Sequence, residues 1–253
     1  MSEEQEPTAP LRPRKKSSQR RRKYRRFRKN FFVAFFIDLV VVLGAALVLS
    51  LLIKTFLIRS FFIPSGSMLE TLQIDDRIIV NQLTPALYPI ERGDVVVFKD
   101  PGGWLGPDIE EPTDPVVVAV DWFLSAFGIT APDSKQHLVK RVIGVAGDKV
   151  ICCDANGLIT INGAPITEPY LASGQTPSTV EFDVTVPKNS LWVLGDNRGN
   201  SEDSRFHGDL PSKGFVSNDW VVGRAFIISW PVSNWEWLDN YPDVYKNVPD
   251  PSN

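Results

Sequence analysis

The sequence contains few of the residues that build metal and redox sites: two histidines and two cysteines among 253 residues. Cys152 and Cys153 are neighbours, and a bridge between adjacent cysteines strains both the disulfide and the peptide bond. There is no Cys-x-x-Cys pair and no cluster of His and Cys at metal-ligand spacing. We therefore expect neither a metal ion nor a cofactor.

Charge is almost missing from residues 31–53, where Asp38 is the only charged side chain. As a helix this stretch would be roughly 34 Å long, enough to cross a hydrocarbon core of about 30 Å. A carboxylate within a membrane costs on the order of 2.5–3.5 kcal/mol, but the apolar residues around Asp38 outweigh that cost. A cleaved secretory leader is the main alternative, yet its apolar region is only about 7–15 residues long. We expect an uncleaved transmembrane helix with its outer flank over 31–58.

The net charge of −3 conceals an asymmetry between the two ends of the chain. Residues 1–30 hold 12 Lys and Arg against 3 Asp and Glu, whereas the other 223 residues hold 15 and 27. Such a basic segment is typical of a disordered tail, and nucleic-acid binding is one interpretation of it. Next to a membrane span, the same residues instead indicate a cytoplasmic N-terminus. We expect a single-pass protein of the cytoplasmic membrane, in contact with lipid and not nucleic acid, with its body on the outer face.

The rest of the chain is predicted to be mainly β, with a β-rich domain over 59–231. Runs rich in Val, Ile and Phe, bounded by Gly, Pro, Asn and Asp, predict short strands at 78–80, 94–98, 138–145, 149–152, 158–161, 180–186, 191–194 and 221–229. Asn156-Gly157 and Asn162-Gly163 are turn dipeptides on either side of 158–161, which indicates a hairpin.

Three further segments complete the domain prediction. Residues 102–136 and 151–187 are interpreted as insertions into the β domain. Within the first of them, 116–127 is either a helix or a surface element that touches lipid headgroups. Residues 232–253 are rich in Pro and Asp, and we expect a C-terminal loop tail there.

Directly after the apolar span, the motif Pro64-Ser65-Gly66-Ser67-Met68 places two hydroxyls around a glycine. A serine is a poor nucleophile unless a base takes its proton, and Gly66 permits a tight turn that leaves Ser67 exposed. A plain turn between a helix and a strand is the alternative. The G-x-S-x-G elbow of α/β-hydrolases is missing here, and the S-x-x-K motif of penicillin-binding proteins is missing from the whole chain. A base for Ser67 would come from His137 or His207 in a triad, or from a lysine.

Lys140 is the lysine that stands out, because it lies within the otherwise apolar strand predicted at 138–145. Strand alternation puts Lys140 and Arg141 on opposite faces. A lysine with a pKa of about 10.4 is neutral roughly once in 2,500 molecules at pH 7. Burial lowers that pKa by up to about 3–5 units, which makes the amine a usable base. A solvated lysine on a half-exposed strand is the alternative.

A polar loop follows the strand predicted at 191–194. Residues 195–205 include no apolar side chain but carry carboxylates, guanidinium groups and hydroxyls. Because these groups can pair with one another, the loop suits a fixed support around a reactive site.

Together these segments resemble the type I bacterial signal peptidases, membrane-bound Ser-Lys peptidases that remove leader peptides from exported proteins. The resemblance covers about residues 30–230, and its motifs occur in the family's order after an N-terminal span. They are PSGSM at 64–68 with Thr71-Leu72, RGDVVVF at 92–98, KRVIG at 140–144 with GDK at 147–149, and GDNR at 195–198 with NS at 200–201 and DSR at 203–205.

The resemblance implies a role for each matching residue. Ser67 would be the nucleophile, Lys140 its general base, and the Ser65 hydroxyl an oxyanion donor beside the Ser67 backbone N–H. Met68 would help to wall the site and Ser201 would orient the Lys140 amine, supported by Asp196, Arg198, Asp203 and Arg205. The implied substrates are precursor proteins that bear signal peptides, bound as an extended strand and cut after small residues such as Ala.

The sequence departs from the family pattern at two positions. Glu70 stands where the family usually has Pro, and it faces either Lys140 or solvent; it would also suit a peptidase dedicated to one substrate. Gly199 stands where the family usually has Asp, which weakens the argument for a rigid loop. The alternative from another functional class is an inactive, anchored β domain that binds extracytoplasmic partners.

Overall fold

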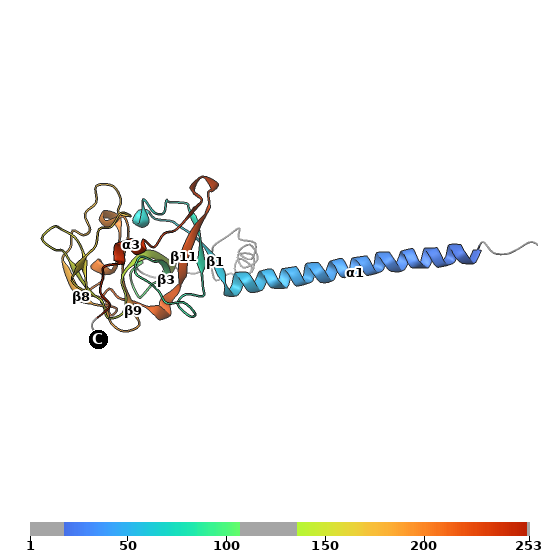
Figure 1. Cartoon of the computed structure of the whole chain (residues 1–253), viewed down its shortest axis with the longest axis horizontal. Coiled ribbons are helices and arrows are strands. Elements are labelled where there is room, and N and C mark those ends of the chain that lie inside the picture. The colour runs from blue at the N-terminus through green and yellow to red at the C-terminus, as the bar shows by residue number, and fades with distance from the viewer. Residues whose placement is uncertain (1–17, 107–135, 252–253) are drawn as a thin grey trace, which may run out of the picture. The chain divides into compact units, whose positions relative to one another are not determined.

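The computed structural model describes residues 18–106 and 136–251, and within these ranges the chain forms two units that divide after Ser50. The first contains most of a long helix, and the second contains antiparallel strands joined by loops and short helical turns (Figure 1). The insertion predicted at 102–136, including the segment 116–127, lies almost wholly outside the described residues.

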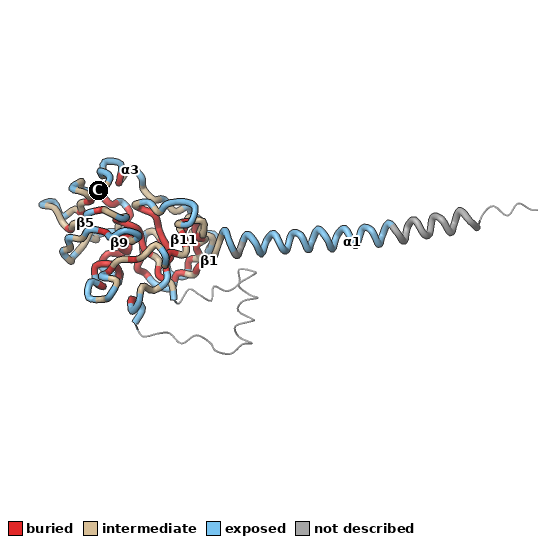
Figure 2. The backbone as a smooth tube through the Cα atoms, turned by 90° about the horizontal axis from the view of Figure 1, so that it is seen from below, coloured by how far each residue is buried: buried red, intermediate tan, exposed pale blue. Residues whose placement is uncertain are grey.

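The helix α1 (Ser18–Phe56) contains one stretch, Phe31–Ile53, that is long and apolar enough to cross a membrane, with a mean hydropathy of 2.8. Every residue of this stretch is exposed (Figure 2), the pattern expected of a helix whose apolar surface does not pack against protein. The helix begins before the expected start, so residues 18–30, expected to belong to a disordered tail, are helical instead. Arg, Lys and Gln are good helix formers, and extending an existing helix avoids the cost of nucleation.

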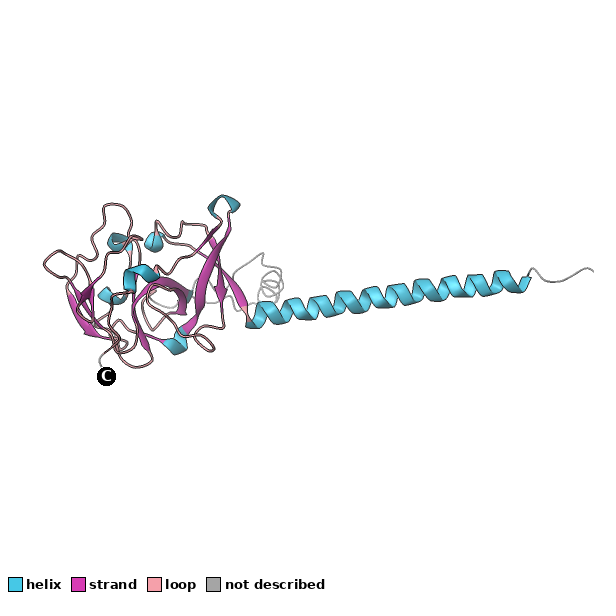
Figure 3. Cartoon of the chain, in the orientation of Figure 1, coloured by secondary structure: helices cyan, strands magenta, loops and turns pink. Residues whose placement is uncertain are grey.

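The second unit is mainly β, as predicted (Figure 3). Its larger sheet follows the strand order β1-β2-β11-β3-β4-β9-β10, with β12 paired to β11. All pairings are antiparallel. The strands are β1 (Ile58–Phe62), β2 (Arg77–Asn81), β3 (Val95–Lys99), β4 (His137–Gly144), β9 (Ser190–Leu194), β10 (Val216–Ser217), β11 (Val221–Trp230) and β12 (Glu236–Trp237). The predicted strands of this region are all present, whereas β1, β10 and β12 were not expected.

Strand β3 explains why the middle of this sheet is buried on both faces. Val95 and Val97 belong to one core cluster, and Val96 and Phe98 belong to another. Because successive side chains of a strand point to opposite faces, a run of four apolar residues supplies a core on each side. The neighbouring strand β4 is therefore held between two apolar layers.

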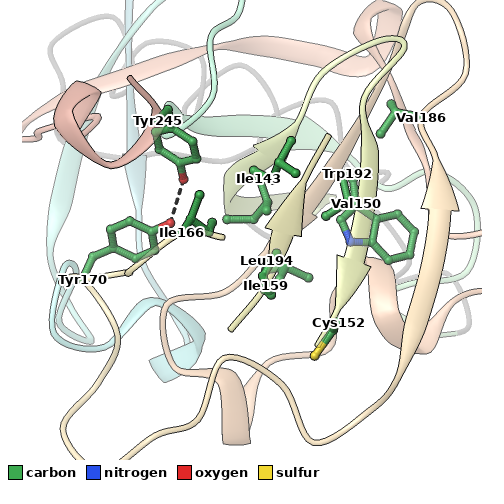
Figure 4. Packing of buried hydrophobic residues seen from close by; sticks show 11 residues of the cluster. Ile143, Val150, Cys152, Ile159, Ile166, Tyr170, Val186, Trp192, Leu194 and Tyr245 are labelled. Atoms are coloured by element: carbon green, nitrogen blue, oxygen red, sulfur yellow. Dashed lines mark hydrogen bonds between the residues drawn. The ribbon is translucent and has the colours of Figure 1, made fainter. Parts of the chain in front are cut away.

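A smaller sheet has the order β7-β6-β5-β8 and is formed by β5 (Lys149–Cys152), β6 (Thr160–Ile161), β7 (Ala164–Pro165) and β8 (Phe182–Thr185). The predicted turn Asn162-Gly163 joins β6 to β7, and both residues have positive φ, 51° and 83°, as a two-residue hairpin requires. Cys152 and Cys153 are joined in a disulfide. Residues of this sheet pack with Ile143, Trp192 and Leu194 of the large sheet in one cluster (Figure 4).

The C-terminal segment is not the plain loop tail that its composition suggests. It contains β12 and the short helix α3 (Pro242–Tyr245), and Tyr245 is only 7% exposed. The Tyr245 and Tyr170 hydroxyls lie 2.7 Å apart in a hydrogen bond (Figure 4), and Val244 and Val248 pack against the same cluster. These apolar residues of a Pro- and Asp-rich segment thus pack against a core cluster formed by other parts of the chain.

Candidate active site

The turn that carries Ser67 follows β1 and is a single turn of 3₁₀ helix, Gly66–Met68. Gly66 does not use a positive φ here; a Cβ at this position would lie 3.0 Å from Leu69 Cδ1, so the glycine serves close packing. Ser67 is 9% exposed, less accessible than the motif suggested. Met68 is 1% exposed and belongs to the core cluster that includes Phe61 and Leu72.

Lys140 lies on β4 and reaches the Ser67 side chain. Its Nζ donates to Ser67 Oγ at 2.8 Å and to the Val139 carbonyl at 3.1 Å. Lys140 is 4% exposed, so the solvated lysine considered as an alternative is not present. Burial lowers the pKa of Lys140 from 10.5 to about 8, against the opposing effects of Asp203, Asp196 and Glu202. About one molecule in ten would then carry a neutral amine at pH 7.

Arg141, the next residue of β4, is paired with a carboxylate. Its Nε and Nη2 donate to Asp196 at 2.9 and 2.8 Å, and both side chains are fully buried. Arg141 Nη1 also donates to the carbonyls of Gly93 and Asp239, and Thr71 donates its hydroxyl to Asp196. Such a bidentate pair fixes the geometry of both groups, so it ties the start of the 195–205 loop to β4.

The 195–205 loop also contacts the Ser67 turn directly. The Asn197 backbone N–H donates to the Ser67 carbonyl at 3.1 Å, and its Nδ2 donates to the Gly66 carbonyl at 2.9 Å. Further along, Asp203 accepts from the Gly195 N–H and from the Arg205 guanidinium. The loop is therefore connected both internally and to the turn.

Ser201 lies beside the turn, although its hydroxyl is not bonded to Lys140. A Cβ added to Gly195 would lie 2.5 Å from both Ser201 Cβ and the Ser67 carbonyl oxygen, which shows how closely these groups approach. Ser201 Oγ is buried and has no hydrogen-bond partner within the ranges that the structure describes. A buried hydroxyl of this kind is available to a partner that arrives with substrate or solvent.

Ser65 and the two histidines differ in their relation to the Ser67 hydroxyl. Ser65 Oγ lies 3.4 Å from Ser67 Oγ, and Ser65 is exposed. His207 Nδ1 is hydrogen-bonded to the Asp203 carbonyl, and its ring stacks on Trp104 at 4.2 Å. The ring of His137 packs near Phe61, and burial, with Arg59 and Lys99, lowers its pKa to about 4. Lys140 is therefore the side chain that contacts the Ser67 hydroxyl in the way expected of a base.

The sequence motifs miss a segment that packs on the loop, residues 168–178 of the expected insertion. Glu168 accepts from Arg198 at 2.5 Å, and both side chains are buried. Gln175 bonds to Asn197 and to the Gly199 N–H. A buried arginine such as Arg198 needs an acidic partner. The sequence alone did not identify Glu168 as that partner, because the two residues are far apart along the chain.

Glu70 has a backbone conformation that its usual family counterpart, Pro, cannot adopt. Its φ is 69°, whereas proline fixes φ near −65°. The side chain is exposed, as in the solvent-facing alternative. The turn therefore continues past Met68 along a path that a proline at position 70 could not follow.

The chain matches the family model described as "Signal peptidase, peptidase S26" over residues 36–230. It belongs to this family. Signal peptidase I of Mycobacterium tuberculosis H37Rv is 38% identical over 222 residues, which cover 78% of this chain and 74% of that protein. Signal peptidase I of Leptolyngbya laminosa is 34% identical over 195 residues, covering 77% and 79%.

Among solved structures, a signal peptidase I from Enterococcus faecalis matches with a TM-score of 0.34 and 23% identity, over 53% of this chain and 95% of that one. Membership of the family makes the chain a serine peptidase and a hydrolase. Within this family it is a signal peptidase, and its membership supports the removal of signal peptides as its activity.

Proposed function

We propose that this chain removes signal peptides from exported precursors by cutting after small residues, with Ser67 as nucleophile and Lys140 as general base. The observation that carries the proposal is the 2.8 Å contact between the buried Lys140 Nζ and Ser67 Oγ. Within the described residues no carboxylate forms an ion pair with Lys140; Asp203, Asp196 and Glu202 favour the protonated amine, but burial outweighs them and lowers its pKa.

The reaction begins when the neutral Lys140 amine accepts the Ser67 proton as Oγ attacks the scissile carbonyl carbon. A C–O bond forms, and the carbonyl electrons move to the oxygen, giving a tetrahedral oxyanion. The Ser65 hydroxyl and the Ser67 backbone N–H donate to that oxyanion. One such donor typically contributes about 2.7–4 kcal/mol to the transition state.

Collapse of the oxyanion breaks the C–N bond, and the Lys140 ammonium returns its proton to the departing amine. The released amine is the N-terminus of the mature protein, while the signal peptide remains as an ester on Ser67. Water then attacks the ester, Lys140 accepts its proton, and Ser67 leaves with that proton. The carbonyl of Val139 keeps the amine oriented throughout.

Substrate binding by strand addition is supported by the position of β1. This strand begins the order of the large sheet, pairs with β2 within the described residues, and leads directly into the Ser67 turn. An extended peptide that adds to a sheet edge is held by backbone hydrogen bonds, and shallow pockets then select its side chains. Small residues such as Ala in Ala-x-Ala fit that mode.

Membrane anchoring by α1 is supported by the apolar stretch Phe31–Ile53. The 12 Lys and Arg of residues 1–30 favour a cytoplasmic N-terminus, with one span and the peptidase domain on the outer face. An anchored enzyme meets its substrates where their own apolar leaders are held, at the membrane surface.

The proposal is tested with the full-length protein in lipid and a set of precursors that carry Ala-x-Ala sites. Wild type is expected to cleave them, whereas Ser67→Ala and Lys140→Ala are expected to be inactive with unchanged folding. Activity that survives Lys140→Ala would assign the base to another group. A folded wild type that leaves every precursor uncut would favour a binding domain, and cleavage of one precursor alone would favour a dedicated peptidase.

A further inference from the structure

The side chain of Gln175 connects two parts of the 195–205 loop. Its Oε1 accepts from the Gly199 N–H at 2.5 Å, and its Nε2 donates to Asn197 Oδ1 at 3.2 Å. The segment that carries it is itself bonded to the loop, because the Ala172 N–H donates to the Asp196 carbonyl and the Gln175 N–H donates to the Ala172 carbonyl. The backbone segment that carries Gln175 is thus attached to the same loop that the Gln175 side chain contacts.

These contacts form a chain of hydrogen bonds with one possible direction. The chain begins at the Gly199 N–H, which can only donate, passes through the amides of Gln175 and Asn197, and ends at the Gly66 carbonyl, which can only accept. Each amide must therefore turn its oxygen toward Gly199 and its nitrogen toward Gly66. The Gly66 carbonyl favours the nitrogen of the Asn197 amide and the Gln175 donor holds its oxygen, so the loss of Gln175 removes one of the two contacts that orient this amide.

The orientation of Asn197 bears directly on the nucleophile. Asn197 donates through its side chain to the Gly66 carbonyl and through its backbone to the Ser67 carbonyl. These two carbonyls belong to the turn that places Ser67 Oγ 2.8 Å from Lys140 Nζ. Reactions between positioned groups lose about 100-fold when the groups are displaced by roughly 1 Å.

Gly199 provides the space that Gln175 occupies. A Cβ on Gly199 would lie 2.9 Å from Gln175 Oε1 and 3.2 Å from its Nε2, and Gly199 has no left-handed φ that would itself forbid a side chain. An alanine at 199 would therefore fit the backbone and displace the glutamine amide. Gly199, which the sequence suggested would weaken the loop, is the residue against which the Gln175 amide packs.

We propose that Gln175 is a positioning residue for the peptidase reaction, which sets the Asn197 amide and through it the Ser67 turn. The inference rests on the proposed Ser67–Lys140 function. Gln175→Glu is the sharpest variant, because it keeps the size and the acceptor toward Gly199 but replaces the donor toward Asn197 with an oxygen. Gln175→Ala removes both contacts. Thr176→Ala is the matched control, since this neighbouring side chain is exposed.

The experiment measures kcat and KM of the full-length protein in lipid with an Ala-x-Ala precursor, beside the Ser67→Ala variant. Gln175→Glu, Gln175→Ala and Gly199→Ala are each expected to lower kcat by about 10- to 100-fold with little change in KM. Because Gly199→Ala acts by displacing Gln175, adding it to Gln175→Ala is expected to cost nothing further. Wild-type kcat in either Gln175 variant, fully additive losses, or an equal loss in Thr176→Ala would overturn the inference.

A readout independent of catalysis separates this inference from the proposed function. Nuclear magnetic resonance of the Asn197 side-chain amide is expected to show faster proton exchange in Gln175→Glu than in wild type, because its hydrogen bond to Gly66 is lost. Unchanged exchange would overturn the inference even if the enzyme is active. Cleavage that survives Ser67→Ala would overturn the proposed function while this exchange measurement still decides the role of Gln175.

Discussion

Lys140 and Arg141 are consecutive on β4, yet Lys140 contacts the Ser67 hydroxyl while Arg141 pairs with the Asp196 carboxylate. The strand pleat separates the two cations, so the buried carboxylate is neutralised by the residue that does not need to lose a proton. Lys140 is left beside a neutral hydroxyl in a buried environment, which lowers its pKa to about 8. In the proposed mechanism, Arg141 thus supports the loop while its neighbour Lys140 transfers the proton.

Removing Arg141 is expected to destabilise the fold. Arg141→Ala leaves Asp196 buried without its partner, and breaking a buried ion pair in this way costs about 3–5 kcal/mol. Thermal unfolding of the detergent-solubilised chain measures the loss. Lys149→Ala is the matched control, because its pair with Asp183 is more than half exposed and such pairs contribute about 0–1 kcal/mol. Similar losses in the two variants would contradict the special importance of Arg141.

Cleavage is expected to accelerate as the pH rises through the pKa of Lys140. The neutral amine is the active form, so kcat should increase about tenfold per pH unit below pH 8 and level off above it. Steady-state kinetics on one precursor between about pH 6 and pH 10 measure the profile. A flat profile across this range, as a base with the His137 pKa of about 4 would give, or a rise that has not levelled off by about pH 10, would contradict a lysine base with a lowered pKa.

The same lowered pKa predicts that Lys140 destabilises the folded protein at neutral pH. Its pKa is 10.5 in the unfolded chain and about 8 in the folded one, so between these values the unfolded chain binds more protons and the free energy of unfolding rises with pH. The shift corresponds to about 3 kcal/mol. Lys140→Met is therefore expected to be inactive but more stable than wild type at pH 7, with the advantage shrinking toward pH 10.5.

Chemical denaturation of the two proteins at several pH values measures this difference. Lys149→Met serves as the control, because Lys149 is exposed and its replacement should leave the pH dependence unchanged. A Lys140→Met variant that is less stable than wild type at pH 7 would show that burial of the amine is not the dominant cost.

The sequence was sufficient for features that depend on local pattern. Alternation along β4 predicted that Lys140 and Arg141 diverge, and the Asn162-Gly163 dipeptide predicted the hairpin turn. Both follow from periods and conformations that neighbouring residues determine. The apolar span also follows from its length and composition alone.

Features that depend on distant contacts could not be predicted in this way. Tyr245 gains its buried position from Tyr170, far away in the sequence, so the C-terminal segment looked like loop. Strand β1 contains Arg59 and Ser60 and follows directly on α1, which hides its pairing with β2. Gln175 is a polar residue in a loop, and nothing near it in the sequence indicates that it meets Asn197.

The 195–205 loop leaves no room for a side chain where it passes the Ser67 turn at Gly195, and a single methyl group there is expected to disable the site. A Cβ on Gly195 would lie 2.5 Å from both the Ser67 carbonyl oxygen and Ser201 Cβ. The Ser67 carbonyl is backbone and cannot move without moving the nucleophile. Gly195→Ala should therefore lower kcat by about 100-fold or more, with a loss of about 1–3 kcal/mol in stability from overpacking.

Gly208→Ala is the matched comparison for that substitution, because among the described residues no heavy atom outside its two chain neighbours lies within 4 Å of its added Cβ, and its φ is not left-handed. Cleavage assays and thermal unfolding of both variants, in the same lipid preparation, are expected to show an inactive Gly195→Ala and an unchanged Gly208→Ala. Full activity in Gly195→Ala would mean that the loop can withdraw from the turn without cost. The contacts of Asn197 with Gly66 and Ser67 would then not be needed to hold Ser67 against Lys140.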